Sequence, residues 1–502
     1  MATSRLRAAT LRSLGSDVAV PGYDRSDLTI GIVHIGAGAF HRSHQAVYLD
    51  QLMNAGRAKE WAICGVGLLP ADRPKARAFG AQDGLYTVLV KHADGRTEPR
   101  VIGSLADYIY APDDPARLLS RLTDPRTRIV TLTITEGGYN AHPVTGEFDS
   151  AAAGIRADLR PGASPATVFG YLTEALRRRR ADGIAPFTIA SCDNVQGNGD
   201  LARRMFGAFA DLAEPGFGDW VRAQVAFPNS MVDRITPVTT DADIDQLRAT
   251  FSLEDAWPVV CEPFIQWVLE DSFPTGRPPW EDCGVQLVRD VTPYELMKLR
   301  LLNAGHQALA YAGVLAGYQY AHEAATDPVF AEFVTGYMQH EARPTLLPVP
   351  GIDLDDYIAT LMERFANPAI RDTLARLATA GSDRIPKFLL PVIGHNLTYG
   401  GPVARSAAVI ASWARYAEGT DEAGRPIEIV DPRSAELTEL ASRQQADPLS
   451  FVRNEHLFGD AADQERFAAA YLSALSAIRE SGARAAFAGI NAASVTSPPT
   501  PP

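Results

Sequence analysis

The sequence predicts an α/β fold in which an N-terminal Rossmann-type domain with a parallel sheet precedes a mostly α-helical C-terminal domain. In the first half, short β-branched runs alternate with helical stretches, a pattern typical of a parallel sheet with helices on both faces. From about Pro293 onward, leucine, alanine and charged residues recur at helical spacing. The chain of 502 residues, 46% hydrophobic and 21% charged, is too long for one small core.

Four short apolar runs account for the predicted sheet, because runs rich in isoleucine, valine and threonine favour buried strands. We expect these strands at residues 30–35, 61–66, 129–134 and 187–192. Helical patterns lie between them, at residues 40–55 and 166–180. The first of these helices ends at Gly56, a typical helix stop signal.

The second half is predicted to be helical. We expect helices at residues 294–320, 355–365, 369–379, 406–418 and 464–481. The predicted organisation is an N-terminal arm (1–27), a Rossmann-type dinucleotide-binding domain (28–287), a helical substrate-binding and catalytic domain (288–490) and a disordered tail (491–502). Residues 1–16 are rich in arginine and lack acidic residues, so an organelle transit peptide is the alternative to an arm.

Charge and cysteine content argue against several classes of protein. Acidic residues number 60 and basic residues 47, a net charge of −13, whereas proteins that bind nucleic acids or anionic membranes are usually basic. No apolar run reaches the ~18 residues of a membrane span. The cysteines form no C-x-x-C pair, so we expect no disulfide, no metal site and reduced thiols in a cytoplasmic protein. They are Cys64, Cys192, Cys261 and Cys283.

A glycine-rich turn follows the first predicted strand and opens a helix. In a dinucleotide-binding turn the first glycine allows the tight turn and the second lets the backbone approach a pyrophosphate, which the helix N-terminus also attracts. A histidine stands where the usual motif has its third glycine, and a turn without a ligand is the alternative. The expected cofactor-binding residues are Ile35, Gly36, Ala37, Gly38, Ala39, Phe40 and His41.

A dinucleotide site also needs a carboxylate beyond the second strand to bind the ribose hydroxyls. Asp72 is the candidate, although it lies further along the chain than the usual ~20 residues. A carboxylate favours NAD because it repels the extra phosphate of NADP, and the adjacent Arg73 weakens this preference. The alternative is a loop aspartate before Pro74.

Reactive side chains are densest near Lys298. In a helix with about 100° per residue, Glu295 lies about 60° and His306 about 80° from Lys298. Asn303 lies at about 140°, on the same arc. A lysine in an apolar face loses proton affinity through desolvation, which makes Lys298 a candidate general base. The alternative is a surface helix with Lys298 in water.

Asn194 follows the fourth predicted strand. The carboxyl ends of the strands in an α/β sheet face the ligand crevice, and an amide N–H₂ group there would hold a developing alkoxide. The alternative is that this polar stretch is only a turn.

Five motifs in order along the chain resemble the polyol-specific long-chain dehydrogenase/reductase family, most closely its mannitol 2-dehydrogenases. The resemblance runs from about residue 11 to about residue 490. The motifs are G-I-V-H-I-G-A-G-A-F-H-R-S-H-Q-A (31–46), T-E-G-G-Y (135–139), S-C-D-N-V-Q-G-N-G (191–199), F-P-N-S-M-V-D-R-I-T-P (227–237) and K-L-R-L-L-N-A-G-H-Q-A-L-A-Y (298–311). The lead-in at residues 21–24, P-G-Y-D, also resembles the family and favours an arm at the N-terminus.

The resemblance implies a monomeric enzyme that transfers a hydride between NAD(P) and an open-chain polyol without zinc, with Lys298 as the general base. The leading hypothesis is the NAD-dependent oxidation of D-mannitol to D-fructose, and the reverse. The resemblance also implies that Asn194 and Asn303 polarise the substrate oxygen and that His306 orients the substrate. Glu295 is implied to tune the proton transfer, and so is Glu136, which we count with the cofactor-binding residues. The implied substrate-binding residues are Asp233, Arg376 and Arg384.

Other substrates and another function stay open as alternatives. Within the family, the substrate could be D-arabinitol, sorbitol or a hexuronate, and the family's Lys-x-Pro is replaced here by Arg384-Ile385-Pro386, which changes the geometry of the charge. A phosphorylated sugar would need a basic pocket near Arg376, Arg384 and Lys387. A catalytically inactive nucleotide-binding regulatory protein is the alternative of another class. The prediction of an enzyme requires that the amine of Lys298 lies close to the nicotinamide ring of the cofactor.

Overall fold

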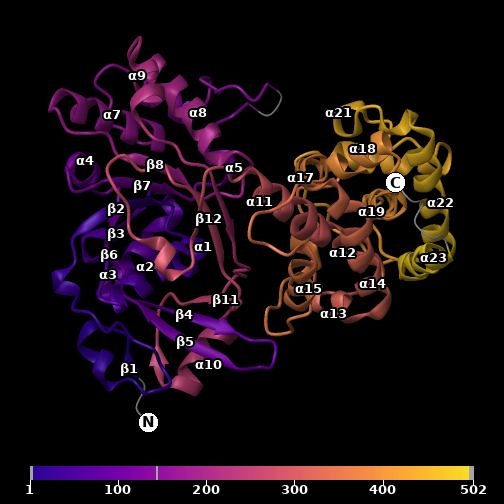
Figure 1. Cartoon of the computed structure of the whole chain (residues 1–502), viewed down its shortest axis with the longest axis horizontal. Helices are drawn as coiled ribbons and strands as arrows, with labels where there is room; N and C mark the ends of the chain where they lie inside the picture. The colour runs from indigo at the N-terminus through magenta and orange to yellow at the C-terminus, as the bar shows by residue number, and fades with distance from the viewer. Residues whose placement is uncertain (1–3, 143–144, 497–502) are drawn as a thin grey trace. The chain divides into compact units, whose positions relative to one another are not determined.

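The computed structural model describes residues 4–142 and 145–496 (Figure 1). The chain forms two compact units, of which the first ends at Thr292 and the second begins at Pro293. The first unit carries the sheet and the second is helical, which confirms the predicted fold class. We describe each unit by itself.

The sheet of the first unit has five parallel strands in the order β6–β3–β2–β7–β8. This order is that of a Rossmann fold, with β2 at the centre. The strands are β2 (Ile30–Ile35), β3 (Ala62–Gly67), β6 (Leu105–Tyr110), β7 (Ile129–Leu132) and β8 (Thr188–Ser191). Strand β2 has the predicted bounds, and β3, β7 and β8 overlap their predictions with ends that differ by one or two residues, whereas β6 was not predicted.

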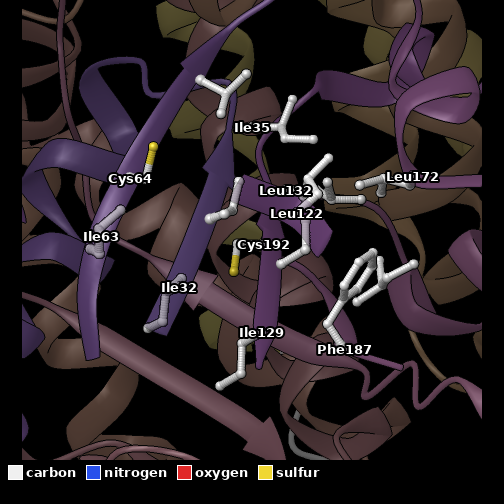
Figure 2. Packing of buried hydrophobic residues seen from close by; sticks show 14 of the residues in the cluster. Ile32, Ile35, Ile63, Cys64, Leu122, Ile129, Leu132, Leu172, Phe187 and Cys192 are labelled. Atoms are coloured by element: carbon white, nitrogen blue, oxygen red, sulfur yellow. The ribbon is translucent and has the colours of Figure 1, made fainter. Parts of the chain in front are cut away.

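Isoleucine, leucine and cysteine side chains from these strands fill the core (Figure 2). Ile32, Ile63 and Leu132 are almost wholly buried, because helices cover both faces of the sheet. Cys64 and Cys192 lie in the same core as free thiols, and burial raises the pKa of both.

The helix predicted at residues 40–55 is interrupted. It forms as α1 (Ala39–Ser43) and α2 (Gln45–Asn54), separated by His44, whose backbone leaves the helical region at φ −121° and ψ −91°. The His44 Nε2 atom lies 2.7 Å from the carbonyl oxygen of Gln266, so a tertiary contact accompanies the break. Helix α7 (Val168–Ala181) agrees with the helix predicted at 166–180.

Two further three-stranded sheets were not predicted. One has the order β11–β4–β5 and the other β13–β12–β9. Their strands are β4 (Tyr86–Lys91), β5 (Thr97–Ile102), β9 (Ser230–Asp233), β11 (Val259–Cys261), β12 (Gln266–Glu270) and β13 (Gln286–Val288).

The described part of the arm, from Ser4 onward, packs on the first unit. Strand β1 (Ser4–Arg5) pairs in parallel with β10 (Leu253–Glu254). Leu6 and Val18 are buried in a small second core beside Leu89. Residues 1–3 lie outside the described residues.

The second unit is built around α12 (Ala304–Leu315), which is buried along nearly its whole length. It packs against α19 (Ala404–Tyr416), and α19 packs against α22 (Glu465–Ser481). Gly313 allows a close approach to α16 (Leu374–Leu377), since a Cβ there would lie 2.7 Å from Leu374. No helix among residues 4–142 and 145–496 is both long and apolar enough to cross a membrane.

Two predicted boundaries in this unit are wrong. The helix expected at 369–379 is only the short α16 (Leu374–Leu377), because the preceding residues form turns around Asn367 and Asp372. Helix α23 (Ala483–Thr496) extends into the predicted disordered tail, where an alanine-rich sequence favours helix. The rest of that tail, residues 497–502, lies outside the described residues.

Candidate active site

The glycine turn lies at the carboxyl end of β2, the central strand of the Rossmann sheet. Gly36 has φ +92°, and a Cβ there would overlap the carbonyl oxygen of Thr133 at the end of the neighbouring strand. The Thr133 hydroxyl donates a hydrogen bond of 2.6 Å to the Gly36 carbonyl. Only glycine therefore fits the first position of this turn.

The turn also leaves room beside its second glycine. A Cβ on Gly38 would meet only the Gly36 carbonyl oxygen among the described atoms, at 3.6 Å. This open backbone next to a switch point of the sheet is the feature that a pyrophosphate requires. Helix α1 is only five residues long, so its macrodipole contributes less than that of the continuous helix we predicted.

Two stacked histidines, one on β2 and one on α1, flank the glycine turn in the sequence. The rings of His34 and His41 lie 3.4 Å apart and nearly parallel. The nitrogens of His34 bond to the hydroxyls of Thr131 and Thr133, at 2.7 and 2.9 Å. Burial lowers the pKa of His34 to about 3, so the ring is neutral. The side chain of His41, which is predicted to bind the cofactor, is 1% exposed, so only its backbone could contact a ligand.

Arg42 is a supporting residue that we did not predict. Its guanidinium lies 3.6 Å from the ring centre of Trp257 and donates to the Trp257 carbonyl oxygen. Its Nε atom donates to the carbonyl oxygen of Gly38 at 3.3 Å. Arg42 therefore ties the second glycine of the turn to a neighbouring loop.

Asp72 lies at the carboxyl end of β3, the strand beside β2. A Cβ on Gly67, the last residue of β3, would lie 2.5 Å from the Asp72 Cβ. One carboxylate oxygen accepts the Leu69 amide and the other accepts from Lys75, both at 2.9 Å. This is the place in a Rossmann fold from which a carboxylate reaches ribose hydroxyls.

Glu136 is exposed in the short helix α5 (Thr135–Gly138), which follows β7. Asp193, at the end of β8, holds this turn by accepting the amides of Ile134 and Thr135. It also accepts from the Tyr139 hydroxyl at 2.7 Å. Burial raises the pKa of Asp193 despite these donors. The role of Asp193 was missed, although it lies within a motif that we identified.

Asn194 comes directly after Asp193 and is exposed. Since β7 and β8 are paired in parallel, Glu136 and Asn194 follow strands that end at the same edge of the sheet. The Asn198 side chain fixes this loop, because it donates to the carbonyl oxygens of Asp193 and Ser230. Asp233 is buried at the end of β9, whose first residue is Ser230.

In the second unit, the predicted helix at 294–320 is not a continuous α-helix. It comprises α11 (Thr292–Met297), a π-helix (Lys298–Asn303) and α12. The amide of Ala304 donates to the carbonyl of Leu299, five residues back. Residues five apart lie on one face of a π-helix, so Lys298 and Asn303 are closer in angle than the about 140° of an ideal α-helix.

The polar side chains of this helix are buried. Glu295, Lys298 and His306 are 7%, 8% and 9% exposed. The alternative of a surface lysine in water therefore does not hold. The His306 ring packs against Phe365 with centroids 4.3 Å apart.

The Asn303 side chain carries an oxygen with no hydrogen-bond partner among the residues that the structure describes. This oxygen, Oδ1, is buried. Buried polar atoms in folded proteins almost always have a partner, from the protein, water or a ligand. The Oδ1 atom of Asn303 is therefore available to accept a hydrogen bond from water or a ligand.

The two predicted arginines have protein partners of their own. The guanidinium of Arg376 forms a two-pronged ion pair with Asp372, four residues earlier. Arg384 donates to the carbonyl oxygen of Leu377 at 3.0 Å. Arg376 is exposed and Arg384 half-buried.

Together, these residues fit a dinucleotide in the first unit, with the pyrophosphate at the glycine turn and a ribose at Asp72. The donors suit this cofactor because backbone amides bind phosphate and a carboxylate accepts from hydroxyls. Within residues 4–142 and 145–496, no three histidine, cysteine or acidic side chains are grouped as metal ligands.

Two family models match the chain over most of its length. Residues 30–282 match the mannitol dehydrogenase Rossmann domain, and residues 290–479 match the mannitol dehydrogenase C-terminal domain. The "Mannitol 2-dehydrogenase" of Phaeosphaeria nodorum is 45% identical over 97% of this chain and 86% of its own.

Two solved structures are similar to the whole chain. Pseudomonas fluorescens mannitol 2-dehydrogenase, in a ternary complex with NAD and D-mannitol, has a TM-score of 0.88 and 44% identity over 97% of this chain and 99% of its own. A D-sorbitol dehydrogenase in substrate-free form has a TM-score of 0.90 and 39% identity over 96% of this chain and 100% of its own. With both domain models matched in order and relatives aligned almost end to end, the chain belongs to the mannitol dehydrogenase family.

Proposed function

We propose that this protein oxidises D-mannitol to D-fructose with NAD, and catalyses the reverse reaction, with Lys298 as the general base. The observation that carries the proposal is the 44% identity, over nearly the full length, to an enzyme solved with NAD and D-mannitol. The reaction needs a site for the cofactor and a base. The glycine turn and Asp72 suit the cofactor, and the buried lysine suits the base.

The reaction removes a hydride from a carbon and a proton from its hydroxyl, so that a C=O bond replaces C–H and O–H. NAD, when bound, supplies the hydride acceptor. The Nζ atom of Lys298 takes the hydroxyl proton, and burial of the amine disfavours its charged form. Glu295 lies three residues before Lys298 and is also buried, which suits it to pass the proton on.

Negative charge develops on the substrate oxygen as the proton leaves. The amides of Asn194 and Asn303 donate hydrogen bonds to that oxygen, in place of the metal ion that other alcohol dehydrogenases use. His306 orients the substrate from the same helix as Lys298. The unpartnered Oδ1 atom of Asn303 supports a ligand contact at this side chain, because that oxygen remains available to accept a hydrogen bond.

A second candidate substrate is D-sorbitol, since a D-sorbitol dehydrogenase is 39% identical to this chain. The charge of Arg376 is paired with Asp372, which makes a hexuronate or a sugar phosphate held by this arginine a weaker candidate than a neutral polyol. Asp233, Arg376 and Arg384 are proposed to select among the neutral polyols.

The test is a panel of polyols and ketoses, each assayed with NAD(H) and NADP(H), with and without EDTA. We expect D-mannitol and D-fructose with NAD(H) to give the highest kcat/KM, with no loss in EDTA. A higher kcat/KM for D-sorbitol would support the second candidate. Loss of activity in EDTA, restored by a divalent metal, would contradict the metal-free mechanism.

The cofactor site is tested by Gly36→Ala. The added Cβ overlaps the Thr133 carbonyl oxygen at a φ that costs a residue other than glycine about 1–3 kcal/mol. We expect a loss of NADH affinity of about tenfold or more, measured by fluorescence titration. Gly80→Ala is the matched control, because its Cβ meets no described atom within 4 Å. Equal NADH affinity in both variants would refute the assignment of the turn.

A further inference from the structure

Two π-helices lie in the second unit, and hydrogen bonds join them at Arg300. The first is Lys298–Asn303 and the second is Tyr337–Ala342. The Tyr337 hydroxyl donates to the carbonyl oxygen of Arg300 at 3.0 Å. The Arg300 guanidinium donates to the carbonyl and hydroxyl oxygens of Thr345, at 2.6 and 2.9 Å.

Thr345 links Arg300 to the second π-helix, since its hydroxyl donates a hydrogen bond of 2.6 Å to the carbonyl oxygen of Ala342. Ala342 is the last residue of the second π-helix and Tyr337 is the first. Both ends of the second π-helix are thus connected to Arg300. We call the set Arg300, Tyr337, Ala342 and Thr345 the π-clamp.

The second π-helix is itself fixed. Glu341 is wholly buried and accepts the amides of Arg405 and Ser406 at the start of α19, at 2.7 and 2.8 Å. The side chain of Asn396 donates to the Glu341 carbonyl oxygen at 2.9 Å. The second π-helix, to which the first is hydrogen-bonded, is therefore itself fixed by hydrogen bonds to α19 and to Asn396.

A π-helix is rare because it interrupts the regular i→i−4 hydrogen bonds and leaves a backbone group in need of another partner. Here the Arg300 carbonyl finds that partner in Tyr337, which is 0% exposed. Burial raises the pKa of Tyr337 well above its usual value, so the hydroxyl keeps its proton and stays a donor. Without this donor, an α-helical register for residues 298–303 gains relative stability.

The register matters because Lys298 and Asn303 are five residues apart. The π register places them on one face, whereas an α register separates them by about 140°. We propose that Arg300 and Tyr337 are positioning residues, which hold the π-helix so that the Lys298 amine and the Asn303 amide act on the same substrate oxygen. This inference rests on the proposed function.

The test is Tyr337→Phe, which removes one hydroxyl and keeps the ring. A small misplacement of catalytic groups costs up to about a hundredfold in rate, so we expect kcat for polyol oxidation to fall by about tenfold to a hundredfold. NADH affinity is expected to stay unchanged. Hydrogen exchange of the amides at 298–304 is expected to speed up. Thr345→Val, which removes the hydroxyl link to Arg300 and Ala342, is expected to lower kcat in the same direction.

Tyr471→Phe is the matched control. The Tyr471 hydroxyl is also wholly buried in this unit and donates to Gln444 at 2.9 Å, so its loss lowers stability without touching the π-clamp. A second control is the double variant Lys298→Ala/Tyr337→Phe. If Tyr337 acts through the lysine, its removal costs little further rate in the absence of that lysine.

Wild-type kcat in both Tyr337→Phe and Thr345→Val, with melting temperatures lowered as in Tyr471→Phe, would overturn the inference and leave the proposed function standing. Additive losses in the double variant would also overturn it, because the hydroxyl would then act independently of Lys298. If the wild-type protein oxidises no polyol, the proposed function falls, and this inference falls with it.

Discussion

Lys298→Ala is expected to lower kcat for D-mannitol oxidation by about 10²–10⁴-fold at neutral pH, the range that a general base contributes. The amine is buried, so water cannot readily replace it as the proton acceptor. NADH affinity is expected to be unchanged, because the residues proposed to bind the cofactor all belong to the first unit. Steady-state kinetics and fluorescence titration of NADH measure the two quantities separately.

The matched control is Lys59→Ala, which removes a half-exposed lysine whose amine forms an ion pair of 2.9 Å with Asp27. Surface ion pairs of this kind contribute little to stability. Its kcat should equal that of the wild type. Small primary amines added to Lys298→Ala should restore part of the lost rate. Undiminished turnover in Lys298→Ala would show that another group takes the proton.

Asn303→Ala is expected to lower kcat by about 10²–10³-fold, the usual cost of removing one donor to a developing oxyanion. The Oδ1 atom of Asn303 has no hydrogen-bond partner among the described residues, so loss of this oxygen should cost little stability. Asn303→Asp keeps the shape but removes the N–H₂ donor, and it should be at least as slow.

Asn454→Ala serves as the control for loss of an amide, since the Asn454 side chain donates to the Glu436 carboxylate at 2.7 Å. Its kcat should match the wild type. The assignment of Asn303 fails if Asn303→Ala raises only KM while kcat stays at the wild-type value, because the amide would then contribute equally to ground-state and transition-state binding.

Most of the central sheet was predictable because each strand is buried on both faces and reads as an apolar run. Strand β2 agrees residue for residue with its prediction. Strand β5, T-E-P-R-V-I, was missed because charged residues and a proline interrupt its apolar pattern, whereas β4, Y-T-V-L-V-K, was missed although it is an apolar run of the same kind as the predicted strands. Strand β6, L-A-D-Y-I-Y, carries an aspartate that masks its pattern.

For the candidate site, the sequence indicated which segments carry polar groups but not how the groups support one another. Asp193 and Asn198 lie inside a motif that we identified, yet their hydrogen bonds to other loops depend on tertiary structure. The π-helix could not be predicted, because the helical periodicity that we applied assumes 3.6 residues per turn throughout. That assumption placed Asn303 too far from Lys298.

The central claim is that a neutral amine at position 298 accepts the substrate proton, and the pH dependence of kcat/KM for D-mannitol oxidation tests it most directly. In the wild type, we expect kcat/KM to rise with pH through one ionisation to a plateau, because only the unprotonated amine is a base. In Lys298→Ala this ionisation should disappear, leaving a residual rate that increases in proportion to hydroxide. The same ionisation and plateau in the variant as in the wild type would contradict the account.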